Sequence, residues 1–416
     1  MSRLIFHIDV NSAYLSWEAT YRLQQGDGID LREIPSVVGG DEESRHGIVL
    51  TKSIPAKKFN IKTGETLYNA RIKCPEIVIV PPRYWLYMQC SSAMNKIFLE
   101  YTPNIQRFSV DESFLDFSNM GHLYPDYMEL ADNLRERIKK ELGFTVNIGI
   151  SNNKLLAKVA SDFKKPDRVH TLFPHEIKEK MWPLPVEDLF MVGHATAPKL
   201  HNLNINTIGD LATYDLEILK NKLKSHGQVI WNYANGIEFS EVRKSNHIEA
   251  KGIGNSTTIS FDVEDKETAH KILLSLCETV SMRLRDSQNC CTVVSISIRG
   301  SDLIFYSRQK KLAVATDSTR KIYEVACYLF DSVWKDNPIR HLGVHVTDFC
   351  GNDFYQSSLF DTFNYEKDRK INETVDKIRL KYGSKAVVRS CFLHSGLSAS
   401  CGGIGEEDYP LMSAIL

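Results

Sequence analysis

Two short acidic segments, each set in strand-like apolar sequence, most constrain what this chain can fold into. Residues 4–14 carry Asp9, and residues 105–115 carry the adjacent pair Asp111 and Glu112. Carboxylates within or beside a sheet are costly to bury unless a cation or hydrogen bonds stabilise them. Divalent cations prefer carboxylate oxygens, and three carboxylates can hold two such ions for a phosphoryl transfer. The pattern therefore predicts a metal-dependent site at the ends of neighbouring strands.

A simpler interpretation of Asp9 stays open at this point. An Asp at a strand end commonly caps the helix that follows, and Ser12 is itself a good cap residue. The pair Asp111 and Glu112 is harder to explain in this way, because it interrupts an apolar strand pattern that resumes at Phe114. Such an interruption indicates a functional site or a tight hairpin.

Length and composition favour a folded, soluble protein of two to four domains. The chain has 416 residues, of which 43% are hydrophobic and 25% are charged. It contains no membrane-length apolar run and no signal-peptide pattern at its start, and its nine cysteines lack C-x-x-C spacing. Reduced thiols and a cytoplasmic location are therefore expected. Net charge is −1, but basic residues gather in residues 51–83 and 154–168, which fits contact with phosphates or nucleic acid.

The order of the expected elements predicts an α/β domain of the split βαβ kind. The elements are a strand at 3–10, a helix at 12–25, a hairpin at 105–117, a helix at 124–142 and a strand at 145–150. Short strands and helices at roughly 30–80 form an insertion in this pattern. The arrangement places Asp9 and Asp111 on neighbouring central strands.

The second half of the chain predicts two further kinds of structure. Residues 174–240 have short helical patterns without alternating strands. A separate α+β module follows, and a single helix is expected beyond it at 365–381. The expected elements of the module are strands at 253–261, 291–299 and 342–349, and helices at 266–286 and 317–336.

Three motifs resemble those of bacterial Y-family (translesion) DNA polymerases. They are residues 8–14, residues 109–113, and residues 147–158 leading into 161–166. Their order and spacing are together specific, and the resemblance covers residues 3–350. It implies a multidomain α/β and α+β right-hand polymerase with a ferredoxin-like palm. The implied domains are the palm at 1–29 and 81–170, the fingers at 30–80, the helical thumb at 171–242, the DNA-binding little finger at 247–350 and a C-terminal tail at 351–416.

By this resemblance Asp9, Asp111 and Glu112 are catalytic residues that hold two Mg²⁺ ions, with the Val10 carbonyl as a further ligand. The implied reaction is two-metal nucleotidyl transfer from dNTPs to a primer 3′ end on a template, in DNA damage tolerance. The implied partners are primed template DNA, dNTPs and the β sliding clamp, and the protein is expected to be a monomer without membrane contact.

Three further residues are implied to bind the nucleotide. Tyr14 falls at the aromatic steric gate against the ribose 2′-hydroxyl, although an ordinary core aromatic is the plainer interpretation. Lys165 matches a triphosphate-binding lysine, although a solvated lysine at a helix C-terminus is also common. Ile54 and Lys57 stand where the family often has Tyr and Arg. Isoleucine donates no hydrogen bond and lysine lacks the bidentate fork, so only the charge of Lys57 is kept.

Two other segments are implied to bind DNA and the clamp. Val192, Gly193 and His194 lie in a stretch that resembles a helix-hairpin-helix, whose backbone N–H groups bind DNA phosphates. His194 replaces the usual second glycine, and a plain helix–helix turn is the alternative. Downstream, a peptide with Gln356, Leu359 and Phe360 resembles the bacterial clamp-binding motif, in which apolar side chains fill a surface pocket.

Parts of the sequence also suggest two functions other than polymerase activity. The run Gly39, Gly40, Asp41, Glu42 resembles the hairpin of diguanylate cyclases. Such domains are much shorter, and the cyclase hypothesis leaves Asp111 and Glu112 unexplained. A non-catalytic DNA-binding protein on a polymerase fold is the other alternative, and the intact acidic trio argues against it.

Overall fold

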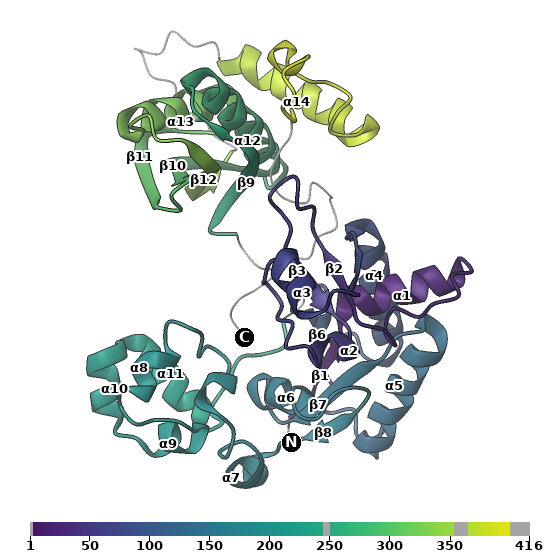
Figure 1. The fold of residues 1–416 in the computed structure, drawn as a ribbon. Helices are drawn as coiled ribbons and strands as arrows, with labels where there is room; N and C mark the ends of the chain where they lie inside the picture. Colours follow the sequence, from purple (N-terminus) through teal and green to yellow (C-terminus); the bar gives the residue numbers. More distant parts are fainter. Residues whose placement is uncertain (1–2, 244–249, 353–364, 400–416) are drawn as a thin grey trace. The chain divides into compact units, whose positions relative to one another are not determined.

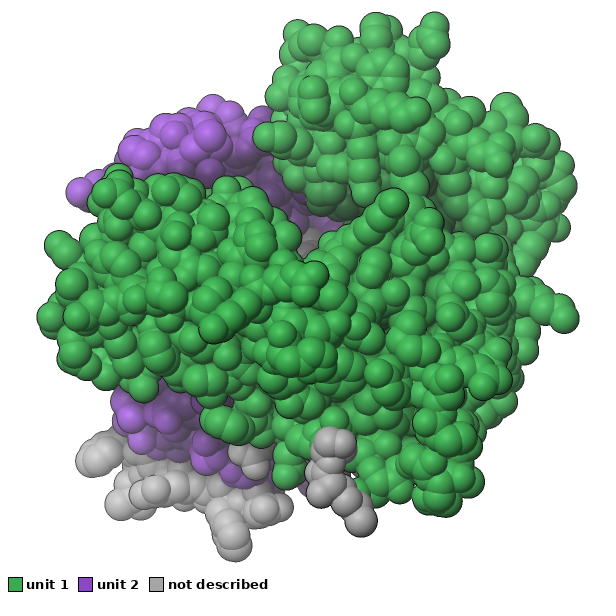
Figure 2. Space-filling view, turned by 90° about the horizontal axis from the view of Figure 1, so that it is seen from below, with its two compact units in different colours: residues 1–39, 49–248, 408–416 green, residues 40–48, 249–407 purple. Residues whose placement is uncertain are grey.

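The computed structural model describes residues 3–243, 250–352 and 365–399. The chain divides into two compact units, which Figure 2 colours separately. Unit 1 comprises residues 1–39, 49–248 and 408–416, and unit 2 comprises residues 40–48 and 249–407. No helix of the described residues is long and apolar enough to cross a membrane.

A five-stranded sheet forms the centre of unit 1 (Figure 1). Its strand order is β5-β6-β1-β7-β8. The strands are β1 (Ile5–Val10), β5 (Ile105–Arg107), β6 (Glu112–Asp116), β7 (Val146–Ser151) and β8 (Val169–Thr171). Antiparallel pairing of β1 with both β6 and β7 is the order expected of a ferredoxin-like split βαβ unit. The predicted palm topology is confirmed, and β8 adds a fifth strand that was not predicted.

Alternation along β1 divides its side chains between two layers. Phe6, Ile8 and Val10 belong to the core formed with α1 (Ala13–Gln24), α4 (Tyr84–Tyr101) and α5 (Tyr127–Leu142). Ile5 belongs instead to the core that includes the apolar residues of α6 (Lys154–Ser161). His7 and Asp9 share the face of Ile5, so the polar residues of β1 face α6.

Gly149 of β7 lets α6 lie unusually close to the sheet. A Cβ atom at this position would lie 1.9 Å from the carbonyl oxygen of Ala157 and 2.4 Å from the backbone nitrogen of Ser161. Such distances exclude any side chain, so glycine is required by the close approach of two backbones. The close contact brings the polar side of α6 next to the face of the sheet that carries Asp9.

The insertion of residues 30–80 forms a small layer of its own. Its three strands lie in the order β3-β2-β4. The elements are β2 (Ser36–Gly39), β3 (Val49–Lys52), α2 (Ile54–Lys57), α3 (Leu67–Lys73) and β4 (Val78–Val80). The short strands and helices predicted for roughly residues 30–80 are therefore present, the helices as α2 and α3.

Residues 174–234 form only short helical elements, as predicted. They are η1 (Pro174–Glu176), α7 (Ile177–Lys180), η2 (Val186–Asp188), α8 (Ala197–His201), α9 (Ile208–Thr213), α10 (Leu216–Leu223) and α11 (Ser225–Ala234). The chain leaving them is held by Lys154, which is fully buried at the start of α6. Lys154 Nζ donates to the Glu241 carbonyl at 2.9 Å and to Gln106 Oε1 at 3.2 Å.

Unit 2 contains a four-stranded antiparallel sheet with the order β11-β10-β12-β9. Its elements are β9 (Gly252–Val263), α12 (Lys266–Asp286), β10 (Asn289–Gly300), β11 (Phe305–Thr316), α13 (Thr319–Val333) and β12 (Ile339–Gly351). The two helices share one apolar core with the sheet. Three strands and both helices agree with the sequence, whereas the edge strand β11 was not predicted.

The C-terminal region packs onto unit 2. It contains α14 (Tyr365–Tyr382), close to the helix predicted at 365–381, and η4 (Ser390–Phe392). Buried Glu278 of α12 is bound by Arg379 and Arg389, each at 2.5 Å. Arg285 of α12 binds Asp376 of α14 at 2.6 Å. These ion pairs make residues 365–399 an integral part of unit 2.

Candidate active site

The strand register brings the three carboxylate residues together. Asp9 in β1 lies directly opposite Glu112 in β6. The backbone N–H of Val10, at the end of β1, donates to the Asp111 carbonyl at 3.1 Å. As predicted, Asp9 lies on a central strand, but Asp111 lies just before the neighbouring strand β6, which begins at Glu112. Asp9 does not act as a helix cap, because its carboxylate binds Lys165, and Ser12 at the N-cap of α1 makes no side-chain cap hydrogen bond.

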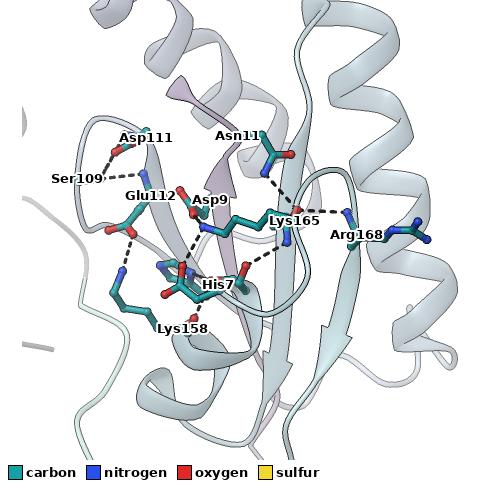
Figure 3. Close-up of polar contacts among 12 residues, drawn as sticks. His7, Asp9, Asn11, Ser109, Asp111, Glu112, Lys158, Lys165 and Arg168 are labelled. Atoms are coloured by element: carbon teal, nitrogen blue, oxygen red, sulfur yellow. Dashed lines mark hydrogen bonds and ion pairs between the residues drawn. The ribbon is translucent and has the colours of Figure 1, made fainter. Parts of the chain in front are cut away.

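Each carboxylate has a polar partner (Figure 3). Asp9 binds Lys165, whose ammonium group also lies 2.8 Å from Asp162. Glu112 binds Lys158 of α6 at 2.5 Å. Asp111 accepts a hydrogen bond of 2.5 Å from the Ser109 hydroxyl. Two lysines thus lie within ion-pairing distance of the acidic cluster.

Burial makes negative charge unfavourable at all three carboxyl groups. It raises the pKa of Asp9 to about 6, against the opposing effect of Lys165. It also raises the pKa values of Asp111 and Glu112, and the carboxylates further raise one another's pKa values. Crowded, desolvated carboxylates of this kind are stabilised by added positive charge. The electrostatics therefore favour cation binding at this cluster.

The donor set suits a hard divalent cation, although the side chains do not converge on one point. Among residues 3–243, 250–352 and 365–399, no three His, Cys, Asp or Glu side chains are arranged to hold a metal ion. The ion pairs of Asp9 and Glu112 with lysines account for this, because they draw the carboxylates toward α6 and its C-terminal loop. These three carboxylates, near the end of β1 and the start of β6, remain the oxygen ligands that Mg²⁺ prefers.

Two buried asparagines hold the loop that carries Lys165. Asn11 accepts from the backbone N–H of Asp167 at 2.9 Å and donates to the Asn147 side chain at 3.2 Å. Asn147 donates to the Lys164 carbonyl at 3.3 Å and accepts from the N–H of Arg168 at 3.3 Å. The loop is therefore fixed on both sides of Lys165. The sequence signal for this role was Asn147, an amide side chain within the apolar strand pattern of residues 145–150.

Lys158 was not assigned to the site from the sequence, although it forms an ion pair with Glu112. Beneath it, the Ser161 hydroxyl donates to the Lys158 carbonyl at 2.7 Å, and the imidazole of His7 lies 2.7 Å from the same hydroxyl. His7 is fully buried, and burial holds its pKa well below the ordinary value. This neutral histidine ties the strand of Asp9 to the helix of Lys158.

Tyr14 lies near the start of α1 in an aromatic cluster. Its ring stacks on Tyr87 of α4, with centroids 4.4 Å apart and an angle of 9° between the planes. It also meets Tyr84 edge-on at 6.3 Å. The side chain is partly buried against the core formed by α1, α4 and the sheet. This packing agrees with the core-aromatic interpretation and is also compatible with a gate, so it does not separate the two.

The predicted nucleotide residues of the insertion lie apart from the acidic cluster. Lys57 is exposed at the end of α2, and Ile54 at its start is 45% exposed. In the part of the chain that the structure describes, Lys57 makes no hydrogen bond or ion pair with the three carboxylates. Only Lys165, among the predicted triphosphate residues, is in contact with them.

The predicted DNA-binding hairpin forms a turn between η2 and α8. Val192 is buried, whereas Gly193 and His194 are exposed. The Gly193 carbonyl accepts from the N–H of Thr196 at 2.8 Å and from that of Ala197 at 2.9 Å, which closes the turn. The predicted clamp-binding residues lie outside the described residues; they are Gln356, Leu359 and Phe360.

Comparison with protein-family models gives three matches along the chain. The impB/mucB/samB family matches residues 8–162, the IMS family HHH motif matches residues 174–205, and the impB/mucB/samB family C-terminal domain matches residues 250–359. Together they cover residues 8–359 except for 163–173 and 206–249.

Curated relatives match over nearly the whole length. DNA polymerase IV of Clostridium acetobutylicum is 50% identical over 393 residues, which are 94% of this chain and 99% of that protein. DNA polymerase IV of Acetivibrio thermocellus is 40% identical over 397 residues, or 94% of this chain and 98% of that protein. A solved Y-family DNA polymerase chimera, Dbh-Dpo4(243-245)-Dbh, superposes with a TM-score of 0.71 and 21% identity, over 84% of this chain and 100% of that chain. At that identity the likeness establishes the fold.

Proposed function

The chain belongs to the impB/mucB/samB family and is a bacterial Y-family DNA polymerase, and we propose that Asp9, Asp111 and Glu112 are its catalytic centre. It is a translesion DNA polymerase that extends a primer on a DNA template with dNTPs. The observation that carries the proposal is the register of β1 and β6, which sets Asp9 opposite Glu112 and beside Asp111. Asp9 is buried and Asp111 and Glu112 are half-buried, and the raised pKa values of all three favour a bound cation.

Divalent metal dependence is general in this family, and we assign the ligands for two Mg²⁺ ions to Asp9, Asp111, Glu112 and the Val10 carbonyl. The ions, when bound, supply Lewis acidity that lowers the pKa of the primer 3′-hydroxyl and neutralise charge on the triphosphate. Lys165 exchanges its ion pair with Asp9 for contact with the triphosphate. Its loop, fixed by Asn11 and Asn147, keeps the ammonium group at the edge of the acidic cluster. The exposed ammonium group of Lys57 is a further triphosphate contact in this proposal.

DNA contacts are assigned to two surfaces, each on its own unit. In unit 1, the exposed turn at Gly193 and His194, supported by buried Val192, offers backbone N–H groups to a DNA phosphate. In unit 2, the face of the sheet opposite α12 and α13 carries polar side chains that suit a sugar–phosphate backbone; they include Ser295, Ser297, Ser307, Gln309 and His345.

One assay separates polymerase activity from the cyclase alternative. Purified protein with a primed template, dNTPs and Mg²⁺ is expected to extend the primer, whereas GTP alone is expected to yield no cyclic dinucleotide. The comparisons favour the first outcome, since the relatives that match nearly the whole chain are DNA polymerases. Product from GTP alone, without extension of the primer, would contradict the proposal.

Tyr14 is proposed as the steric gate that excludes ribonucleotides. Replacing it with Ala removes the ring that would meet a 2′-hydroxyl, so Tyr14→Ala is expected to raise ribonucleotide incorporation relative to deoxyribonucleotide about tenfold. The ratio of kcat/KM values for matched rNTP and dNTP opposite one template base measures the effect. An unchanged ratio would return Tyr14 to the role of a core aromatic.

We propose that the polymerase is a cytoplasmic monomer. We also propose that its peptide around Leu359 and Phe360 binds the β sliding clamp. Two buried apolar side chains contribute roughly 3–6 kcal/mol before ordering costs, which suits exchangeable binding. The variant with both residues replaced by Ala is expected to extend short primed oligonucleotides normally and to lose stimulation by a clamp loaded on circular template. Equal loss of primer extension on both templates would show that the peptide has a structural role. Stimulation by the clamp that persists in the variant would mean that other residues bind the clamp.

A further inference from the structure

The aromatic residue proposed as the gate is packed against a buried polar network. Tyr14 and Glu18 follow one another at a spacing of four along α1, so they share one face of the helix. This face meets the start of α4, where Arg83 is the N-cap and Tyr87 lies in the first turn. The four side chains therefore belong to one contact between two helices.

Tyr87 is the residue on which the ring of Tyr14 lies. The two rings are nearly parallel, at 9°, with centroids 4.4 Å apart. Tyr84 and Trp17 are more distant, at 6.3 Å and 6.0 Å, and meet the Tyr14 ring edge-on or tilted. The face of the Tyr14 ring is thus supported by Tyr87 in particular.

The Tyr87 ring is itself fixed at its far end. It is 1% exposed, and its hydroxyl donates to Glu18 Oε1 at 2.9 Å. Burial raises the pKa of Tyr87 well above its ordinary value, so the hydroxyl remains a donor. A side chain that is buried along its length and hydrogen-bonded at its tip has one available rotamer.

Glu18 is held in turn by Arg83. Glu18 is fully buried, and the Arg83 Nε lies 3.0 Å from Oε2 and 3.2 Å from Oε1. A guanidinium group bound to a carboxylate in this way fixes the plane of the carboxylate as well as its position. The chain of contacts from Arg83 through Glu18 to Tyr87 is therefore rigid.

We infer that Tyr87 is a positioning residue for ribose selection, held by Glu18 and Arg83 so that the ring of Tyr14 cannot turn away from the sugar. The inference rests on the proposed gate function of Tyr14. Exclusion by a clash depends on a ring that does not yield, because a gate free to rotate about its side-chain torsions would admit the 2′-hydroxyl. The network supplies that rigidity without touching the substrate.

The test is the ratio of kcat/KM for rNTP to kcat/KM for dNTP, measured in primer extension opposite one template base. Tyr87→Leu keeps an apolar side chain but removes the stacked ring, and is expected to raise the ratio about two- to tenfold, the range of one aromatic pair. Tyr87→Phe keeps the stacked ring but removes the hydrogen bond from the hydroxyl to Glu18, so it is expected to raise the ratio, by less than Tyr87→Leu does.

Two controls separate positioning from general loss of structure. Trp85→Leu removes an aromatic side chain from the same helix, one that contacts Tyr21 and is 43% exposed, and is expected to leave the ratio unchanged. In a Tyr14→Ala background, Tyr87→Leu is expected to add nothing to the ratio, because it acts only through Tyr14. Loss of folded protein lowers both kcat/KM values equally and does not move their ratio.

The outcomes distinguish this inference from the proposed function. If Tyr14→Ala raises the ratio and Tyr87→Leu does not, Tyr14 remains the gate and the positioning role of Tyr87 is wrong. A Tyr87→Leu effect that persists in full in the Tyr14→Ala background would also overturn the positioning role. If Tyr14→Ala itself leaves the ratio unchanged, both the gate and its support are rejected.

Discussion

Primer extension by the Asp111→Asn variant is expected to fall by about three orders of magnitude. The amide keeps the size of the carboxylate and can still accept the hydrogen bond from the Ser109 hydroxyl, so the hairpin should fold. It removes the negative charge needed to hold divalent ions, whose contribution to the transition state is worth several kcal/mol. Single-nucleotide insertion into a primed oligonucleotide at saturating Mg²⁺ measures the loss.

Asp116→Asn is the matched control for this experiment. Asp116 lies in the same strand, β6, and accepts from the N–H of Ser118 at 2.7 Å, a contact that an amide oxygen can keep. Its pair in β1 is Ile5, at the opposite end from Asp9. Near-parental activity is expected of this variant. Comparable activity of the Asp111 and Asp116 variants would reject the assignment of Asp111 as a ligand.

The second large effect is expected on stability. Arg379→Ala should lower the free energy of unfolding of unit 2 by about 3 kcal/mol, because it deprives buried Glu278 of its buried partner. The value lies at the low end for a broken buried pair, since Arg389 still binds the carboxylate. Urea unfolding of the full chain, with hydrogen exchange of α12 and α14 to assign the transition, measures the change.

A surface arginine on the same helix provides the comparison. Arg369 binds Glu373 at 3.0 Å, and both side chains are at least 40% exposed, so Arg369→Ala is expected to cost less than about 1 kcal/mol. Equal stability of the two variants would show that the ion pair of Arg379 with Glu278 does not stabilise the packing of α14 on α12.

The effect of pH follows from the same carboxylate. Burial alone would raise the pKa of Glu278, but Arg389 and Arg379 outweigh it and lower the pKa below 4.5. A depressed folded pKa means that this stabilisation is full above pH 4.5 and is lost as the pH falls through the folded pKa. The stability difference between Arg379→Ala and its parent should therefore shrink in acid.

The sequence predicted the regular parts of the fold and the acidic residues, but not the edges. Strand β11 was missed because it is an edge strand, and most of its side chains are exposed on both faces. Such a strand is held by backbone hydrogen bonds to β10 and needs no alternating pattern. β8, with three residues, is too short to show a period.

The partners of the carboxylates could not be predicted in the same way. Lys158 and Glu112 are 46 residues apart in sequence, and their contact depends on how closely α6 lies against the sheet. Gly149 decides that distance, yet a glycine in a strand does not say what approaches it. The pairing of Lys158 with Glu112 thus depends on tertiary packing, which the local sequence pattern does not reveal.

The docking of α14 on α12 limits how far from unit 2 a partner can lie when it is bound by the segment that precedes α14. Residues 353–364 join the end of β12 to the start of α14, and both of those elements belong to unit 2. A chain of this length that must leave and return can reach at most about 20 Å from its attachment points. A free tail of the same residues would reach about twice as far. In the proposed complex, a sliding clamp bound to this segment would therefore stay close to unit 2.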